Sequence, residues 1–129
     1  MLKDLVEKNR TCRRFVEAER MDKETLLSLV DLARLCPSAG NLQPLKYLLL
    51  HRKKDCARLF PLLGWAAYLS GWKGPEPGER PTAYVVILHD TNLAASPGCD
   101  HGICAQTMLL GAREKGLAGA MIGAFNPGA

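Results

Sequence analysis

The sequence has few aromatic residues and lacks a long hydrophobic run. Only 6% of its 129 residues are aromatic. The longest apolar stretch, Leu45–Leu50, is interrupted by Lys46 and is far shorter than the roughly 20 residues that span a bilayer. Charged residues crowd the first eight positions, which argues against a secretory signal peptide. We therefore expect a soluble, cytoplasmic protein without a membrane partner.

The excess of positive over negative charge is also small. The 17 Lys and Arg residues against 13 Asp and Glu residues give a net charge of +4. Nucleic-acid binding favours a stronger basic stripe, so we expect no nucleic-acid partner, although the excess suits an anionic small ligand. Five cysteines, an odd number, favour reduced thiols over a disulfide framework. The length and the 47% hydrophobic composition fit a single folded domain over residues 1–129.

Several motifs of catalysis and metal binding are missing. The sequence has no serine nucleophile elbow, phosphate-binding P-loop or dinucleotide glycine fingerprint, so a hydrolase or kinase is hard to support. Residues 99–104 hold Cys99, Asp100, His101 and Cys104, but no second Cys or His pair follows at ligand spacing. Helix capping and packing are favoured for this segment over a reactive Cys104 thiol of lowered pKa. A metal site is favoured least, and we expect none.

Hydrophobic periodicity predicts helices that alternate with strands. Asp22 and Asp100 are placed to cap two of the helices, and Gly116 to end the last one. Helices are expected over residues 2–9, 23–36, 62–72 and 102–115, and strands over residues 46–51, 83–89 and 118–125.

The composition of these segments indicates the fold class. The first two strands are apolar on both faces, which suits inner strands of a sheet that helices cover, so the class is α/β or α+β. Trp65, Tyr68 and Trp72 would share one face of the third helix, where the core or a dimer interface is favoured over a ligand platform. Residues 73–81 hold three prolines and two glycines, so we expect an irregular loop.

The segment from Arg10 to Arg14 is a candidate anion clamp. In an extended segment Arg10, Cys12 and Arg14 point the same way, and in a helix the two arginines are also neighbours. Paired guanidinium groups are the preferred grip on a phosphate. A solvated basic turn is the alternative and is favoured on charge alone.

Two further segments are suited to a flat ligand. The amides of Asn41 and Gln43, in the loop of residues 37–44, offer paired donors and acceptors for a planar heterocycle. A turn with a left-handed Asn41 is the alternative. At Gly123 and Ala124 the small side chains would let backbone N–H groups touch a ring, or let a strand pack closely on a helix. Together these parts favour a phosphorylated flat ligand that supplies its own chemistry.

These motifs, in this order, resemble the FMN-dependent nitroreductase family over Leu5 to Phe125. Arg10-Thr11-Cys12-Arg13-Arg14-Phe15 is similar to the family's opening Arg-x-Ser-x-Arg-x-Phe, and the loop of residues 37–44 resembles its hallmark loop almost letter for letter. The segments 100–106, 116–117 and 121–125 resemble its central helix and following strand, and residues 78–81 are similar to a segment of a short branch.

The resemblance implies an α+β fold, a three-layer α-β-α sandwich with a central, mainly antiparallel sheet flanked by helices. It implies a homodimer with FMN at the subunit interface. Arg10 and Arg14 would bind the flavin phosphate, and the backbone at Gly123 and Ala124 would contact the ring. The other implied cofactor-binding residues are Thr11 and Cys12 beside the phosphate, and Pro37, Ser38, Ala39, Asn41 and Gln43 from the partner loop.

The implied reaction passes a hydride from NADH or NADPH through FMN to a small-molecule acceptor such as a nitroaromatic or quinone, with no side chain as acid or base. A flavin-binding sensor or storage protein without turnover is the alternative, and a thiol or metal protein built on residues 99–104 is a third. Cys12 departs from the family's Ser, and a thiol is a poorer donor. The family continues beyond residue 125 with a helix and a further segment, so we expect residues 125–129 to form a loop and the domain to be incomplete at its C-terminus.

Overall fold

The computed structural model describes residues 1–126, so residues 127–129 of the predicted terminal loop lie outside the described part. Among residues 1–126 no helix is long and apolar enough to cross a membrane. The helices are α1 (Leu2–Lys8), α2 (Lys23–Arg34), α3 (Lys53–Leu59) and α4 (Asp100–Glu114), the short 3₁₀ turns are η1 (Ala39–Asn41) and η2 (Phe60–Leu62), and the strands are β1 (Leu45–Leu50) and β2 (Tyr84–His89).

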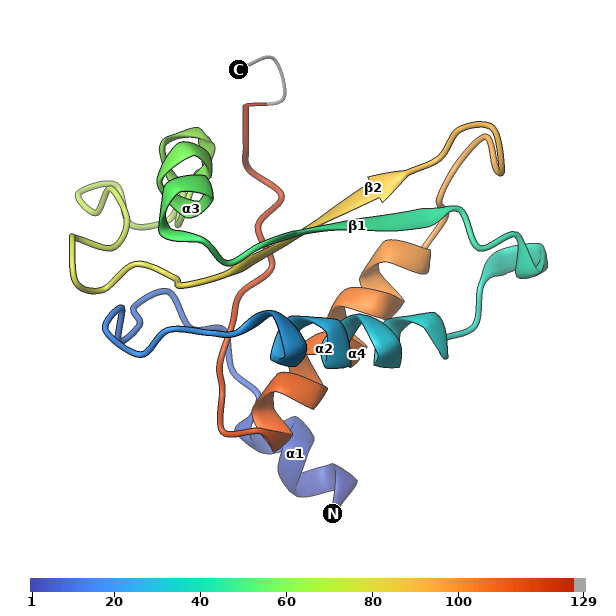
Figure 1. The fold of residues 1–129 in the computed structure, drawn as a ribbon, viewed down its shortest axis with the longest axis horizontal. Helices are drawn as coiled ribbons and strands as arrows, with labels where there is room; N and C mark the ends of the chain where they lie inside the picture. The colour runs from blue at the N-terminus through green and yellow to red at the C-terminus, as the bar shows by residue number, and fades with distance from the viewer. Residues whose placement is uncertain (127–129) are drawn as a thin grey trace.

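The two strands form an antiparallel pair that lies between helices. Leu45 pairs with His89 at one end and Leu50 with Tyr84 at the other. Figure 1 shows α2 and α4 on one side of the pair and α3 on the other, at the end where β1 leaves the sheet. The expected α+β class, with an antiparallel sheet and helices on both sides, is confirmed.

The hydrophobic core lies where α2 and α4 pack against the sheet. The predicted apolar face of α2 is confirmed, since Leu26, Leu29 and Ala33 are buried. Gly111 lets the two helices approach closely, because a Cβ atom at this position would lie 2.3 Å from Cδ1 of Leu32. The core cluster comprises Leu29, Ala33, Cys104, Met108 and Ala112, with Tyr47, Val85 and Ile87 packed on it from the sheet.

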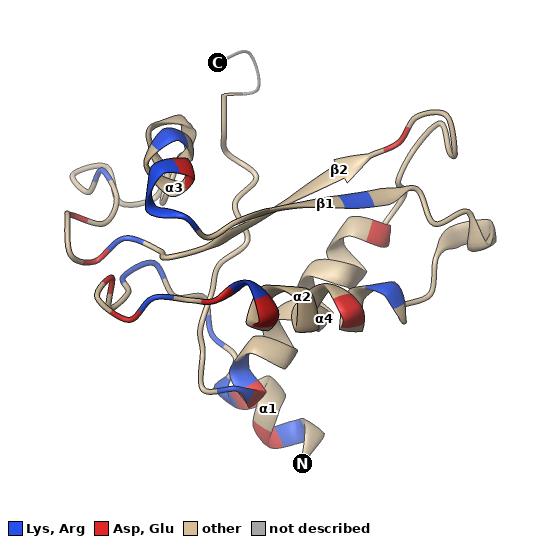
Figure 2. Ribbon diagram, in the orientation of Figure 1, with Lys and Arg blue, Asp and Glu red and all other residues tan. Residues whose placement is uncertain are grey.

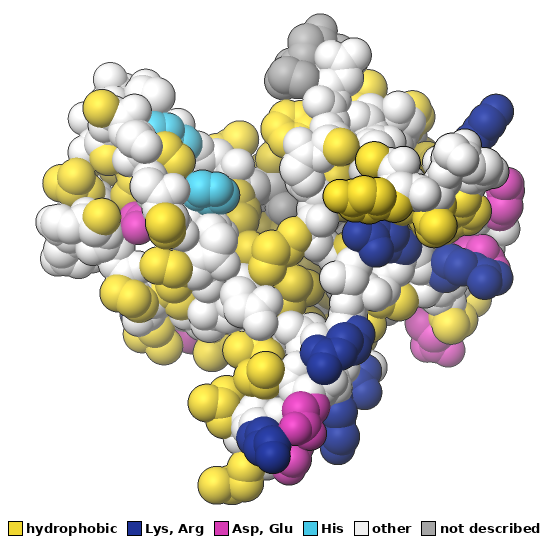
Figure 3. Space-filling view, turned by 180° about the vertical axis from the view of Figure 1, so that it is seen from behind, with side chains coloured by type: hydrophobic (Ala, Val, Ile, Leu, Met, Phe, Trp, Pro, Cys, Tyr) yellow, Lys and Arg dark blue, Asp and Glu magenta, His cyan; other side chains and the backbone are white. Residues whose placement is uncertain are grey.

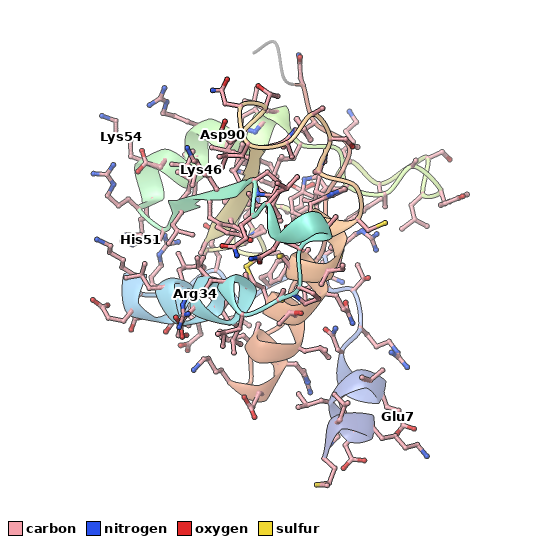
Figure 4. All side chains as sticks on the ribbon, turned by 90° about the vertical axis from the view of Figure 1, so that its right-hand side faces the viewer. Glu7, Arg34, Lys46, His51, Lys54 and Asp90 are labelled. Carbon is pink, nitrogen blue, oxygen red and sulfur yellow. The ribbon has the colours of Figure 1, made fainter. Side chains whose placement is uncertain are left out.

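The opposite face of the sheet is only partly covered. Leu48 and Leu88 are each 48% exposed, because α3 lies over one end of the strands. Lys46 comes from the same face of β1, by the alternation of a strand. Its Nζ lies 2.8 Å from Oδ2 of Asp90, and Figure 4 shows the two labelled residues side by side. The prediction of strands buried on both faces therefore holds for one face only.

The helix predicted over residues 62–72 is wrong. The segment begins as the turn η2, with Pro61 at its start, and continues without regular structure. Gly64 leaves the helical path, since its N–H donates to the carbonyl of Ala124 at 2.6 Å. Trp65 packs against Phe60, with ring centroids 5.8 Å apart, while Tyr68 is fully exposed. Trp65, Tyr68 and Trp72 therefore do not share a helical face, and α3, which precedes them, was not predicted.

The strand predicted over residues 118–125 is also wrong. The segment runs past the sheet without joining it and makes one isolated antiparallel bridge, between Leu63 and Phe125. Its other backbone partners lie outside the strands: Gly119 accepts from the N–H of Cys12 at 2.9 Å, and Ala124 accepts from the N–H of Gly64 at 2.6 Å.

The ends of α2 and α4 show which caps were predicted correctly. Asp22 caps α2 by accepting a hydrogen bond from the N–H of Thr25 at 2.8 Å, as predicted. Gly116 ends α4 with a φ of 77°, also as predicted. Asp100 is not the cap, because Cys99 holds that position and Asp100 is the first helical residue. Its carboxylate instead contacts the loop that precedes β1.

Candidate functional site

The segment from Arg10 to Arg14 directs its three guanidinium groups to separate partners. Nη1 of Arg10 donates to the carbonyls of Val6 and Asn9 at 3.2 and 3.1 Å, at the C-terminal end of α1. Nε of Arg13 donates to the carbonyl of Trp65 at 2.9 Å. Within residues 1–126 neither of these arginines has a carboxylate partner, whereas Arg14 forms a two-point ion pair with a glutamate described below.

An open cavity of about 880 Å³ lies beside this segment. Thr11, Cys12 and Arg14, all predicted site residues, line one side together with Arg13. Cavities of this size are typical of small-molecule sites, and a lining that combines aromatic side chains with arginines suits a flat anion. The other residues that line the cavity are Tyr68, Leu69, Ser70, Gly71 and Trp72, which form its second wall. The sequence did not lead us to assign these residues to a site, although Tyr68 and Trp72 are two of the few aromatic residues of the chain.

The segment of residues 118–124 reaches the arginine segment through Cys12. The N–H of Cys12 donates to Gly119, and its thiol donates to the carbonyl of Arg14 at 3.0 Å. Figure 1 shows the later segment crossing close to the earlier one. Gly123 is exposed, and a Cβ atom there would meet nothing within 4 Å. Ala124 is exposed too, but its carbonyl is bound by Gly64. The backbone of Gly123 is therefore accessible to a ligand, whereas the carbonyl of Ala124 is not free.

The loop after α2 is fixed to the start of α4. The hydroxyl of Ser38 donates to Oδ2 of Asp100, and the N–H of Ala39 donates to Oδ1 of Asp100 at 3.2 Å. Asp100 is only 4% exposed, yet these two hydrogen bonds, that of Ser38 above all, hold the pKa of its carboxyl below the usual range and outweigh the effect of burial. Ser38 also accepts from the N–H of Gln43 at 3.0 Å. Pro37, which precedes it, is exposed.

The exposed part of this loop holds the two predicted amides. Gly40, Asn41 and Gln43 have φ values of 59°, 54° and 51°. The left-handed Asn41 considered from the sequence is confirmed, and the same conformation at Gln43 was not foreseen. Nε2 of Gln43 donates to Oδ1 of Asn41 at 2.7 Å. Left-handed backbone costs about 1–2 kcal/mol at a residue with a Cβ, and strain of this kind clusters at functional sites.

The single chain does not bring the amide loop and the arginine segment together. In Figure 1 residues 38–43 lie at the right-hand end of the molecule, beyond the sheet, whereas residues 10–14 lie on the other side of α2 and α4. Figure 3 shows the same asymmetry from behind, with Lys and Arg gathered on the right and below and few of them on the left. The basic end and the amide end of the molecule are therefore separate surfaces.

The segment of residues 99–104 does not behave as a thiol site. Cys99 is exposed, whereas Cys104 is buried and its thiol donates to the carbonyl of Ala33 at 3.6 Å. Burial raises the pKa of Cys104, so the lowered pKa considered from the sequence is wrong. Within residues 1–126 the structure holds no group of three or more His, Cys, Asp or Glu side chains arranged to bind a metal.

Comparison with known proteins identifies the family. The family model "Nitroreductase family" matches residues 6–129. A nitroreductase family protein from Streptococcus pneumoniae TIGR4 aligns with a TM-score of 0.78 and 16% identity, over 98% of this chain and 78% of that one. A putative nitroreductase from Exiguobacterium sibiricum, solved in complex with FMN, aligns at 0.76 and 17%, over 98% and 76%. A family protein from Clostridium difficile 630 aligns at 0.73 and 23%, over 96% and 69%. No curated protein sequence matches. The chain belongs to the nitroreductase family.

Proposed function

We propose that this protein binds FMN and acts as a flavin-dependent oxidoreductase. Membership in the nitroreductase family supports an oxidoreductase, and a similar structure was solved with FMN. The observation that carries the proposal for this chain is the cavity between Arg14 and Trp72, which joins a cationic edge to an aromatic wall. A phosphorylated planar ligand needs both surfaces within one site.

The residues beside the cavity fit the phosphate end of FMN. Arg13 and Arg14 line the cavity, whereas Arg10 is not among its lining residues and donates to carbonyls at the end of α1. Among residues 1–126 neither Arg10 nor Arg13 has a carboxylate partner. In the proposal Arg10 and Arg14 hold the phosphate while Thr11 and Cys12 line its approach. The thiol of Cys12 is engaged with the carbonyl of Arg14, so the contact that a serine hydroxyl would offer is replaced by a local hydrogen bond.

Contacts with the flavin ring would have to come from segments other than the arginine segment. Gly123 offers exposed backbone in the segment whose Gly119 contacts Cys12, and in the proposal it contacts the flavin ring together with Ala124. The amides of Asn41 and Gln43 lie too far away in the same protomer to take part. We therefore assign them, with Pro37, Ser38 and Ala39, to the site of a partner subunit in a homodimer.

Bound FMN would supply the redox chemistry, accepting a hydride from NADH or NADPH and passing electrons to a nitroaromatic, a quinone or a similar acceptor. The chain itself binds and orients. None of the residues that line the cavity is a histidine, aspartate or glutamate, so its walls hold ligands in place without an imidazole or carboxylate among them. Positioning of this kind lowers a barrier by fixing the reacting groups in advance.

The test is a flavin titration followed by reduction. The purified protein should bind one FMN per chain, seen as quenching of flavin fluorescence, and the bound flavin should bleach on addition of NADH or NADPH without oxygen. Adding a quinone or a nitroaromatic should restore the yellow colour. Bound flavin that neither nicotinamide reduces would indicate a binding protein without turnover. Failure to bind FMN at any concentration would refute the proposal.

A further inference from the structure

Arg14, which lines the cavity, is held by a carboxylate of the loop of residues 73–81. Its Nε donates to Oε2 of Glu79 at 3.0 Å, and its Nη2 donates to Oε1 of the same side chain. Such parallel donation from a guanidinium to a carboxylate is the geometry with which arginine also binds phosphate. Glu79 therefore occupies the donors of Arg14 that a phosphate ligand would use.

The position of Glu79 is fixed by backbone hydrogen bonds. The carbonyl of Glu79 accepts from the N–H of Phe15 at 2.8 Å, and the carbonyl of Gly78 accepts from the N–H of Glu17 at 3.1 Å. Oε1 of Glu17 in turn accepts from the N–H of Arg80 at 3.1 Å. The segment after Arg14 and the loop of residues 73–81 thus form one unit, and Glu79 stays beside Arg14 when the cavity is free.

The Arg14–Glu79 pair lies on the surface, among other charged residues. Figure 2 shows acidic and basic residues interleaved on the loops at the left of the molecule. The side chains of Arg14 and Glu79 are 69% and 36% exposed, so solvent reaches both. The hydrogen bond from Arg14 lowers the pKa of Glu79, which keeps its carboxylate ionised at neutral pH. An exposed pair of this kind is weak enough for a stronger anion to replace it.

We propose that Glu79 is a specificity-determining residue, a built-in counter-ion that a ligand phosphate must displace from Arg14. The carboxylate weakens the binding of every anion at this edge of the cavity, and a dianionic phosphate overcomes it better than a single carboxylate does. The proposal rests on the proposed function only for the identity of the ligand as FMN. Anion competition itself follows from the Arg14–Glu79 geometry.

The test compares Glu79→Gln with Glu76→Gln in the full chain. Both variants lose one negative charge from the same loop, but within residues 1–126 Glu76 has no ion pair. Inorganic phosphate is the probe, and its dissociation constant is measured by ³¹P NMR titration in about 0.1 M salt, where distant charges are largely screened. We expect about fivefold tighter phosphate binding for Glu79→Gln, the upper range for an exposed pair, and less than about twofold for Glu76→Gln. Equal effects of the two variants overturn the proposal.

Arg14→Ala provides the second arm. Combined with Glu79→Gln, it should abolish the gain in phosphate affinity, and a gain that persists without Arg14 overturns the proposal. Thermal melting checks that each variant folds. If Glu79→Gln does not, Glu79→Asp takes its place, because the shorter side chain breaks the two-point contact and should also tighten phosphate binding.

A comparison of FMN with riboflavin, which lacks the phosphate, keeps the two proposals separate. Glu79→Gln should tighten the binding of FMN and leave the affinity for riboflavin unchanged. If the wild-type protein binds neither flavin, the proposed function fails, and the phosphate titrations still decide the role of Glu79.

Discussion

The carboxylate of Asp100, in the first turn of α4, accepts a hydrogen bond from the hydroxyl of Ser38, 62 residues earlier in the chain. Asp100 is almost completely buried, so this contact and the neighbouring one from Ala39 replace the water that the carboxylate loses. The loop that holds the exposed amides of Asn41 and Gln43 is therefore anchored to the helix core.

Asp100→Ala should destabilise the fold strongly. The substitution leaves the hydroxyl of Ser38 and the N–H of Ala39 without their acceptor. We expect the melting temperature to fall by about 5 °C or more. Asp31→Ala is the matched control, because its carboxylate is 59% exposed and pairs only with Arg34 on the same helix. Similar melting temperatures for the two variants would contradict the assigned role of Asp100.

Stability should also fall in acid through Asp100. Its pKa is lower in the folded protein than in the unfolded chain, so the carboxylate contributes stability above the unfolded value of about 4. That contribution is lost as the pH falls through the lower, folded-state pKa. Urea unfolding at pH 6 and at pH 2.5 should show a larger loss for the wild type than for Asp100→Asn, which has no charge to titrate. Equal losses would show that other carboxylates carry the acid dependence.

Gly111→Ala should loosen the contact between α2 and α4. Its new Cβ would lie 2.3 Å from Cδ1 of Leu32 and 3.4 Å from Cδ2 of Leu29. Overpacking costs about 1–3 kcal/mol and exceeds the helix-propensity gain of about 1 kcal/mol, so we expect a net loss of about 1 kcal/mol in the free energy of unfolding. Gly102→Ala on the same helix meets nothing within 4 Å and should be neutral or slightly stabilising. Urea titration measures both, and a stabilised Gly111→Ala would disprove the close contact.

Arg10→Ala should weaken the binding of FMN without affecting the binding of riboflavin. The variant removes a guanidinium that has no carboxylate partner within residues 1–126, and the loss of a charge-assisted hydrogen bond lowers affinity by about 10- to 100-fold. Arg34→Ala removes the same charge from the exposed face of α2, which Figure 4 shows away from the arginine segment, and should leave both flavins unchanged. Titration monitored by flavin fluorescence measures the affinity for both ligands. Equal FMN affinities for wild type and Arg10→Ala would remove Arg10 from the phosphate site.

Elements with one dominant periodicity were predictable from the sequence. The apolar face of α2 repeats at helical spacing, and Asp22 caps it, so both its type and its start were correct. The runs that form β1 and β2 were equally clear. The segment of residues 62–72 also carries helical spacing, at Trp65, Tyr68 and Trp72. There the bond from Gly64 to Ala124, which no local pattern reveals, directs the backbone elsewhere.

The sequence singles out several residues that line the cavity, but it does not reveal which side chains they contact. Thr11, Cys12 and Arg14 are such residues. The partner of Arg14, however, stands 65 positions away in a loop whose prolines and glycines give no periodic signal. Asp100 looked like a helix cap for the same reason, because an aspartate before a helix is usually a cap and its contact with Ser38 depends on tertiary packing.

The hydrogen bond from Cys12 to Gly119 sets the order in which the site can be completed during synthesis. The arginine segment leaves the ribosome well before the segment that supports it, because Cys12 precedes Gly119 by most of the described residues. Contacts between such distant positions form late, since the entropy of closing the long loop is lost before the contacts stabilise the fold. Helices α2 and α4 and the β1–β2 pair can assemble earlier. A chain truncated before residue 119 and released should thus hold the packed core of α2, α4 and the strands without the support that Gly119 gives to the arginine segment.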